Sequence, residues 1–495
     1  MVALLIARQS NAKHSKSNKR LPPRPPGLPL IGHLHLLGKN PHQSFYELSK
    51  KYGPLMALRL GSVPILVASS PAMAKQILQT HDSTFANRVR SIASECSVYG
   101  GASGITFSDA GHYWRSLRQL CAMQFFNAKR IESFQHVRTT EVQRLVRSVM
   151  VEAKVGKSSE IRQKLQTTTN NIVSIMFLGR PLNEISAHGE SKHGSMVHLV
   201  IEALHLLGKF NVSDLMPWLA CMDLQGVASH AKQTGLRMRV AFQTVIDHRR
   251  ELRNGMYEPP QDFLDILLAD PKISDDDIQA MFLDMFGGGS DTSSSLTEWA
   301  LAELLANPEA MRRVEEEVTT VVGEERPVEE ADLPSLPFLQ AVAKETMRLH
   351  PVLPFLVPHR ASHACNVAGY EVAAGTHVFV NTWAISRDPK AWPGHPHPTL
   401  QFCPDRFLDD HTSPDIGLQF HFLPFGSGRR TCPGSSLGLL HFHLLLASLL
   451  HAFHWTCSSS SSPPDLSERF GIVMTKATPL VALATPKPPA KFYYG

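Results

Sequence analysis

A short stretch near the C-terminus combines one cysteine with glycines and an arginine at fixed spacing. Its chemically informative residues are Pro424, Phe425, Gly426, Gly428, Arg430, Cys432 and Gly434. A cysteine that must stay a thiolate needs positive charge and backbone N–H groups directed at its sulfur. The glycines let the chain curl closely enough to supply those groups, and the helical pattern from Ser435 adds the positive end of a helix dipole. The stretch therefore predicts a binding site for one iron, with Cys432 as the thiolate ligand.

An acid and a hydroxyl follow a run of glycines in the middle of the chain. Asp291 and Thr292 come directly after Gly287-Gly-Gly-Ser290, within a helical pattern that runs from Ser274 to Asn307. Each glycine in a helix interior costs up to about 1 kcal/mol relative to alanine. A chain tolerates that cost where something must lie flat against the backbone, or where the helix must open locally. We therefore expect a bound group or a local opening beside Asp291 and Thr292.

Two pairs of side chains have the spacing that places them on one helical face. Trp114 and Arg118 are four residues apart, so a ring and a cation can reach one target together. Glu345 and Arg348 are three residues apart and can form an ion pair. An exposed pair of this kind contributes little to stability, so its value depends on burial.

Together, and in this order, the segments resemble the motifs of the cytochrome P-450 family, whose members are haem-thiolate monooxygenases. The resemblance runs from Leu21 to Pro489. It implies a mainly α fold with small β-sheets, in which the haem lies between a long central helix and the C-terminal cysteine loop and helix. It also implies an oxidoreductase that incorporates an oxygen atom from O2 into its substrate.

The resemblance assigns haem-binding roles to several residues. The cofactor would be haem b, with Cys432 as the axial ligand of its iron. Trp114 and Arg118 would meet a haem propionate. Arg360 and Arg430 would supply further cations, because the planar guanidinium group pairs bidentately with carboxylates. The full set expected to bind the cofactor is Cys432, Trp114, Arg118, Arg360, Phe425, Arg430 and Gly434.

The resemblance also separates a catalytic pair from a structural cluster. Asp291 and Thr292 would guide protons to the bound oxygen. Glu345 and Arg348 would lock onto the later segment Pro404-Asp-Arg-Phe407, where Arg406 would join a buried charge cluster. That cluster would hold the thiolate side of the haem in register.

The substrate pocket is expected to be apolar. The residues that fall in the family's substrate-contacting regions are Phe286, Phe355, Leu356, Ile472 and Val473. The C-terminal Met474 to Leu480 segment and the proline-rich hinge look most like the plant group that acts on phenylpropanoids, flavonoids and other phenolics. The resemblance therefore favours hydroxylation of a small lipophilic or phenolic plant metabolite.

Three other functions remain open at this stage. A fatty acid or terpenoid would also fit an apolar pocket. A haem-thiolate isomerase or dehydratase needs no proton relay, so the Asp291-Thr292 pair argues against it. A haem-binding protein without turnover would keep Cys432 but would need neither relay nor open pocket.

The electron donor is expected to be a separate protein. The sequence has no GxGxxG motif that opens a helix after a strand, so it offers no nicotinamide or flavin site. The resemblance implies NADPH-cytochrome reductase as that partner, with O2 and a small substrate as the reactants.

The surrounding elements follow from local patterns. Short β-like runs on either side of Gly61-Ser62 predict a hairpin. Ser274 with three aspartates after it predicts the start of a helix of about 30 residues, roughly 45 Å long. The apolar run from Leu437 to Trp455 contains several histidines and predicts a buried core helix under the cofactor.

Composition sets the outer limits. The chain has 495 residues, 43% hydrophobic and 19% charged, and we expect a single catalytic domain over residues 33–495. A basic segment at residues 1–20 and a proline-rich hinge at residues 21–32 precede it. The net charge of +5 is too slight and too scattered to indicate nucleic acid.

The start of the chain bears on its location. Met1 to Ala7 is apolar but only about a third of the length that a spanning helix requires. We expect either a truncated anchor or attachment by surface contacts, at the cytosolic face of the endoplasmic reticulum membrane. Seven cysteines without CxxC spacing fit a reducing compartment.

Overall fold

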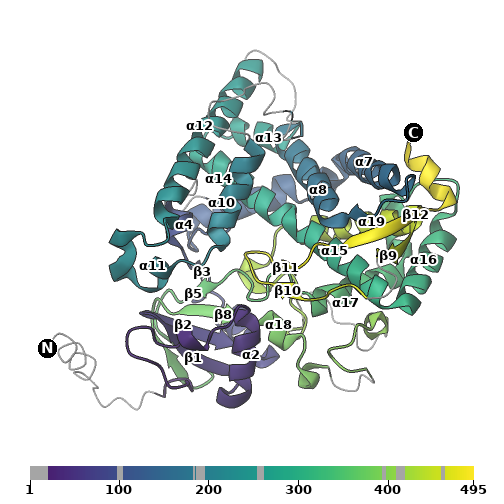
Figure 1. The fold of residues 1–495 in the computed structure, drawn as a ribbon. Coiled ribbons are helices and arrows are strands. Elements are labelled where there is room, and N and C mark those ends of the chain that lie inside the picture. The colour runs from purple at the N-terminus through teal and green to yellow at the C-terminus, as the bar shows by residue number, and fades with distance from the viewer. Residues whose placement is uncertain are drawn as a thin grey trace.

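Helices make up most of the molecule, and its largest sheet lies at one edge of the helical body together with helix α2, Pro41–Tyr52 (Figure 1). The computed structural model describes residues 20–96, 104–181, 184, 196–253, 261–392, 397–408, 419–458 and 463–494. The expected anchor segment, Met1 to Lys19, lies outside the described residues. The mainly α fold with small sheets is confirmed.

The helices vary from single turns to the long α12. Besides α2, they are α3 Pro71–Lys75, α4 Ile92–Cys96, α5 His112–Leu120, α6 Ala128–Ser133, α7 Gln135–Ala153, α8 Ile161–Leu178, α10 Met196–Gly208, α11 Val212–Leu215, α12 Val227–Arg253, α13 Phe263–Ala269, α14 Asp275–Gly289, α15 Asp291–Ala306, α16 Pro308–Val322, α17 Pro337–Leu349, α18 Thr382–Ile385 and α19 Ser435–Ala452. Short 3₁₀ or π segments join several of them, at Leu34–Leu36, Gln76–Thr80, Cys121–Phe125, Pro217–Met222, Glu330–Ser335, Pro389–Ala391, Pro404–Phe407, Gly428–Arg430 and Pro488–Tyr494.

The largest sheet has the strand order β1-β2-β8-β5-β3. Its strands are β1 Leu55–Leu60, β2 Val63–Ala68, β3 Asn87–Arg88, β5 His359–Arg360 and β8 His377–Val380. β1 and β2 form the predicted antiparallel hairpin, and β2 pairs in parallel with β8. The short β3–β5 pair brings residues 87–88 beside residues 359–360, far away in the sequence.

Smaller sheets join distant parts of the chain. β4 Ser159–Glu160, β12 Val481–Pro486 and β9 Phe453–Cys457 form one sheet, while β6 Cys365–Val367 pairs with β7 Tyr370–Val372. β10 Glu468–Arg469 pairs with β11 Thr475–Lys476 to close a short C-terminal loop.

The central helix is interrupted at Ser290. The helix start predicted at Ser274 is present, and it forms a capping box in which the Ser274 side chain accepts from the Asp277 backbone N–H. The expected single helix of about 30 residues is, however, two helices, α14 and α15, separated by Ser290 at φ −98° and ψ −65°. The Ser290 hydroxyl donates to the Phe286 carbonyl oxygen at 2.6 Å, and such local bonding competes with the regular helix ladder. The Ser290 N–H still donates to the Phe286 carbonyl oxygen at 3.2 Å, so the departure from regular helix is confined to one residue, and it corrects the continuous helix.

The C-terminal helix α19 is a core element, as predicted. By length and composition it could cross a membrane, but 67% of it is buried inside the protein. It belongs to the largest hydrophobic cluster, which also takes in parts of α7, α15, α16 and α17. The residues after Ala452 form strand β9 rather than continuing the helix to Trp455.

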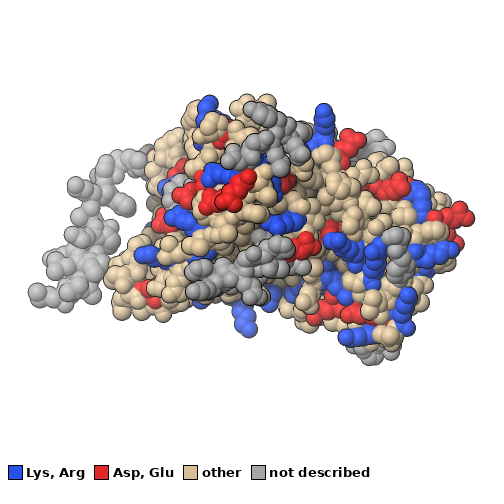
Figure 2. Space-filling view, turned by 90° about the horizontal axis from the view of Figure 1, so that it is seen from above, with Lys and Arg blue, Asp and Glu red and all other residues tan. Residues whose placement is uncertain are grey.

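The outer surface carries both signs of charge. Figure 2 shows Lys and Arg interspersed with Asp and Glu on one face, as the ion pairs of α12 with its neighbours also indicate. A face of this kind does not present the single-sign stripe that binds nucleic acid.

Candidate active site

The cysteine loop connects the Phe422–Phe425 segment to helix α19. The Cys432 backbone N–H donates to the Phe425 carbonyl oxygen at 3.0 Å and closes the loop. Gly426 and Gly428 have φ of +70° and +71°, where glycine is favoured. A Cβ on Gly428 would lie 2.1 Å from the Leu78 carbonyl oxygen, so the backbone approach itself requires glycine.

Gly434 plays a different part from the other two glycines. Its φ of −95° is open to any residue, and it is the N-cap of α19. A Cβ there would lie 3.3 Å from the Phe126 ring. Gly434 therefore serves close packing against Phe126 rather than a left-handed turn. The prediction that all three glycines let the chain curl holds for Gly426 and Gly428 only.

Opposing effects act on the pKa of the Cys432 thiol, and the net result is a raised pKa. Burial, the largest effect, raises the pKa of the Cys432 thiol, while the Gly434 N–H and the Arg118 guanidinium lower it. Helix α19 starts at Ser435, as expected, and presents its positive end to the loop. The protein alone thus favours the thiol, and a bound cation is what would keep the sulfur a thiolate.

Three arginines gather on one side of the cysteine loop. Arg118 comes from α5, Arg430 from the loop itself and Arg88 from β3. The Arg430 guanidinium stacks over the Trp114 ring at 4.2 Å, whereas the sequence paired that ring with Arg118, so a shared target of Trp114 and Arg118 stays a prediction. All three arginines donate to backbone carbonyl oxygens, those of Val357, Thr431, Ala86, Ile105 and Ser108.

These arginines carry positive charge that no neighbouring carboxylate neutralises in an ion pair within the described part of the chain. Burial, followed by repulsion from Arg430 and Arg118, holds the pKa of Arg88 well below its ordinary value. Burial is also the main cause that lowers the pKa of Arg430 to about 10. Nearby, burial and then Arg88 hold the pKa of His359 well below its usual range. The Nε of Arg88 is buried without a partner. Such a cluster is suited to receive an anion.

Arg360 points elsewhere. Its guanidinium pairs with Asp109 at 2.7 Å and donates to the Arg88 carbonyl oxygen at 3.1 Å, and it is about one third exposed. Adjacent residues of a strand face opposite sides, so His359 lies beside the cluster while Arg360 lies outside it. A cofactor-binding role for Arg360 therefore stays a prediction. Arg88 and His359 are the members that spacing alone did not identify.

The acid and the hydroxyl of the central helix face different surroundings. The Thr292 hydroxyl donates to the Gly288 carbonyl oxygen at 2.7 Å. Asp291 instead accepts from Gln166 of α8 at 3.3 Å, and burial raises the pKa of its carboxyl. Consecutive helical residues are about 100° apart, so the two side chains do not act on the same face.

The three glycines before Ser290 divide between packing and open space. A Cβ on Gly287 would lie 2.7 Å from Leu204 of α10, and one on Gly289 would lie 3.0 Å from Val173 of α8. A Cβ on Gly288 would meet nothing within 4 Å. The helix is thus packed on two sides and open above Gly288, where the Thr292 hydroxyl is bonded.

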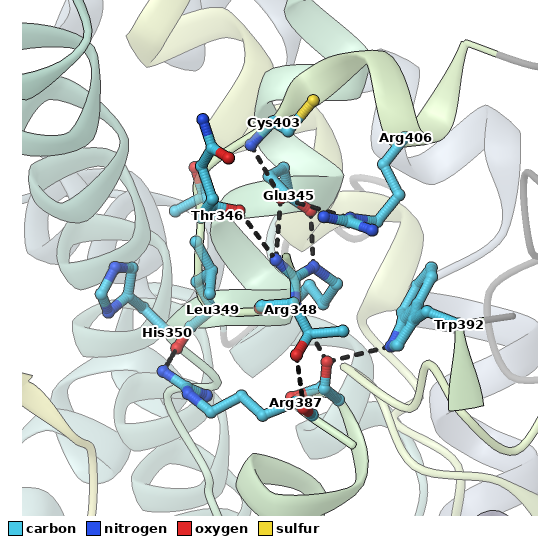
Figure 3. A network of polar contacts seen from close by, with 12 residues as sticks. Glu345, Thr346, Arg348, Leu349, His350, Arg387, Trp392, Cys403 and Arg406 are labelled. Carbon is cyan, nitrogen blue, oxygen red and sulfur yellow. Dashed lines mark hydrogen bonds and ion pairs between the residues drawn. The ribbon is translucent and has the colours of Figure 1, made fainter. Parts of the chain in front are cut away.

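Figure 3 shows a buried ion cluster in which Glu345 and Arg348 of α17 face Arg406. Glu345 and Arg348 form two hydrogen bonds at 2.6 and 2.8 Å, and Arg406 lies 3.5 Å from the same carboxylate. All three side chains are fully buried. Arg348 also donates to the carbonyl oxygens of Ser386 and Thr399. The contacts expected between the early helix and the later segment are therefore present.

Asp405, next to Arg406, is not part of this cluster. Its carboxylate forms two hydrogen bonds of 2.8 Å with Arg313, and this pair is more than one third exposed. The Arg313 hydrogen bonds lower the pKa of Asp405 despite partial burial.

The expected pocket residues occupy several positions. Phe286 is buried and stacks on Phe282 of the same helix. Leu356, at φ +55°, approaches the cysteine loop, where its Cδ1 lies 3.7 Å from the Cβ position of Gly426. Phe355 turns into a separate aromatic cluster with Phe45 and Phe379.

The other two expected pocket residues lie on the C-terminal loop. Ile472 is 36% exposed. Val473 is half-buried against the main core. Substrate contact remains a prediction for all five residues.

The arrangement fits the haem predicted from the sequence. The haem propionates match the group formed by the buried Arg88 and the half-buried Arg118 and Arg430, and the haem iron matches a cysteine that needs a cation to stay ionised. A flat macrocycle also suits the open side of Gly288.

Comparison with known proteins gives consistent matches. The family model described as cytochrome P450 matches residues 22–483. A 3,9-dihydroxypterocarpan 6A-monooxygenase of Glycine max is 38% identical over 488 residues, covering 95% of this chain and 94% of the relative. A flavonoid 3'-monooxygenase of Petunia hybrida is 36% identical over 491 residues, covering 96% of this chain and 94% of the relative. Among solved structures, a zebra fish cytochrome P450 with abiraterone has a TM-score of 0.71 and 28% identity, covering 90% of this chain and all of that chain.

The arginine cluster can be tested by exchanging one charge at a time. We expect Arg88→Gln to speed haem transfer to apomyoglobin by roughly tenfold, because a hydrogen bond to a charged group contributes about 1.5–3 kcal/mol. Arg360→Gln is the matched control and should change the rate less than twofold. Faster haem loss from Arg360→Gln than from Arg88→Gln would reverse the assignment.

The buried ion cluster predicts a large stability effect at one carboxylate. Glu345→Gln leaves two buried guanidinium groups without a counter-charge and should cost about 3–5 kcal/mol in the free energy of unfolding. Asp405→Asn, which removes only a partly exposed pair, should cost less than about 1 kcal/mol. Urea unfolding followed by circular dichroism measures both, and equal losses would show that burial of Glu345 does not matter.

Proposed function

The chain belongs to the cytochrome P450 family of monooxygenases, and on this premise we propose that it hydroxylates a flavonoid or a closely related phenolic metabolite. The two relatives described above act, by their names, on a pterocarpan and on flavonoids. A third, from Campanula medium, is named flavonoid 3',5'-hydroxylase and is 36% identical. The proposal transfers this substrate class to the present chain.

Members of this family hold haem through a cysteine thiolate, and we assign that role to Cys432. The observation that carries the assignment is the meeting of Arg88, Arg118 and Arg430 beside Cys432, where none of the three forms an ion pair with a carboxylate of the described residues. These guanidinium groups would pair with the haem carboxylates. The Trp114 ring would hold the Arg430 guanidinium in place by the cation–π contact already described.

Thr292 and Asp291 of the central helix would hold protons, and Gly288 would leave room for the haem and the substrate beside the helix. When bound, the haem activates O2 with electrons from a redox partner and transfers one oxygen atom to the substrate. Thr292 holds a hydroxyl proton beside the open face of Gly288 and can present it there by leaving the Gly288 carbonyl oxygen. Asp291 keeps a carboxyl with a raised pKa, oriented by Gln166, and can hold a proton behind the helix.

The partners that we propose are NADPH-cytochrome reductase and the cytosolic surface of the endoplasmic reticulum membrane. Trp218, Met222 and Leu224 are each more than half exposed, at 52%, 61% and 55%. They follow α11, whose Leu215 carbonyl oxygen accepts from Ser62 in the β1–β2 turn. Apolar side chains gathered at an edge favour contact with a lipid surface.

The metal ligand can be tested by its optical signature. The reduced native protein with carbon monoxide should give a strongly red-shifted Soret band of the thiolate type. Cys432→Ser should lose that band, because serine is a far poorer ligand at neutral pH. Cys403→Ser, at another buried cysteine, should keep it. A thiolate-type band in the Cys432→Ser protein would refute the assignment.

The substrate class is tested by turnover with reductase and NADPH. We expect hydroxylation of 3,9-dihydroxypterocarpan or of a flavanone, and no product from fatty acids or monoterpenes. Conversion of fatty acids alone would contradict the proposal.

The same assay tests Thr292. Thr292→Val keeps the shape of the side chain and should lower product per NADPH by roughly tenfold or more, because a positioned proton donor contributes about 10²–10⁴-fold. Thr297→Val is the control, since the Thr297 hydroxyl makes the same bond to the Ser293 carbonyl oxygen but is fully buried.

A further inference from the structure

The loop Phe470–Met474 has little backbone support of its own. It joins β10 and β11, which pair Glu468 with Lys476 and Arg469 with Thr475, and the Ala477 N–H donates to the Ser467 carbonyl oxygen beyond them. So short a ladder is marginal by itself. The position of the loop therefore depends also on contacts that its ends make with other elements.

Glu468 provides the strongest of these contacts. One carboxylate oxygen accepts from Gln43 at 3.1 Å and lies 3.0 Å from His42 Nε2. The other accepts from Trp383 at 2.9 Å and lies 3.5 Å from Arg387. The side chain is 7% exposed. His42 and Gln43 belong to α2, and Trp383 to α18.

The ionised state of Glu468 follows from these donors. Burial alone would raise the pKa of the carboxyl, but His42, Arg387 and Trp383 together lower it to about 2. A buried carboxylate held by neutral and cationic donors from separate elements is expensive to leave unpaired. Its removal should therefore release the segment that carries it.

The neighbouring residues extend the same anchorage. The Phe470 ring stacks on His42 at 5.8 Å and meets Phe355 edge-on at 5.9 Å. At the other end of the loop, the Met474 N–H donates to the Val352 carbonyl oxygen at 2.8 Å, and Met474 is fully buried.

The tip of the loop reaches the end of α10. A Cβ on Gly208, the last residue of α10, would lie 3.0 Å from the Ile472 nitrogen and 3.1 Å from the Ile472 Cβ. Phe355, which contacts Phe470, is another of the expected pocket residues. Phe355, Ile472 and Val473 are therefore linked through one loop whose base is held by Glu468.

We propose that Glu468 is a positioning residue for substrate binding, acting through the loop that presents Ile472 and Val473. It touches neither substrate nor cofactor. The inference rests on the proposed function in that the loop must border the substrate pocket. It predicts that Glu468 affects ligands that extend into the pocket and spares those that reach only the iron.

The test uses Glu468→Gln, which keeps an acceptor oxygen but removes the charge. Hydrogen exchange of the amides in Phe470–Met474 should become at least about tenfold faster. In the holoenzyme, optical titration should give about tenfold weaker binding of 4-phenylimidazole, with imidazole changed less than twofold. Glu47→Gln is the matched control, because the Glu47 carboxylate lies on α2, is 66% exposed and pairs with Lys50, and it should change neither quantity.

The outcomes separate this proposal from the proposed function. Unchanged loop exchange in Glu468→Gln overturns it whatever the haem content, and so does an equal loss of imidazole and 4-phenylimidazole binding. A native protein without a thiolate-type band overturns the proposed function instead, while the exchange measurement still decides the role of Glu468. If Glu468→Gln does not fold, Trp383→Phe removes one donor and should give about threefold effects in the same direction; no effect there overturns the proposal.

Discussion

Glu345 is a carboxylate that two fully buried guanidinium groups share, those of Arg348 and Arg406. Removing three charges from water is costly unless they find partners. Arg348 finds them by donating to carbonyl oxygens of the segment that follows α18, and the Cys403 N–H donates to Glu345 itself at 2.9 Å. These bonds tie α17 to the segments around Ser386 and Cys403, so one buried carboxylate joins parts of the chain that are distant in sequence.

The arginines beside Cys432 follow the opposite logic. Arg348 and Arg406 share a carboxylate, although one Arg406 nitrogen is buried without a partner. Arg88, Arg118 and Arg430 repel one another, and among the described residues they donate to backbone carbonyl oxygens and form no ion pair. The first cluster holds an anion of its own, and the second is suited to receive one. A polypeptide accepts such repulsion where a ligand will relieve it, and functional sites are where pKa values are most perturbed. The contrast between these clusters separates a structural ion group from a binding site.

Much of the site was predictable because its residues are local in sequence. The close turn of the cysteine loop, the helix start at Ser274 and the Glu345–Arg348 pair all depend on short spacings that helices and turns fix. Arg88 and His359 were not predictable in this way, since they meet through the β3–β5 pairing of segments about 270 residues apart. The neighbour Arg360 was chosen from the sequence, and the alternation of a strand turns it toward Asp109. The break at Ser290 depends on a hydroxyl that bonds its own helix, a choice that periodicity does not reveal.

Repulsion among the site arginines also links cofactor binding to folding. Anything that binds the folded state and not the unfolded chain adds to stability in proportion to its affinity. Part of the affinity for an anionic cofactor comes from relieving a repulsion that already exists in the folded protein. The cluster lies where α5, β3, β5 and the cysteine loop converge, so relief at that point acts on the sheet and the helical body together. The unpaired charges therefore destabilise the folded protein before the cofactor binds, and binding of the anionic cofactor removes this destabilisation. The free energy of folding is for this reason more favourable for the holoprotein than for the apoprotein.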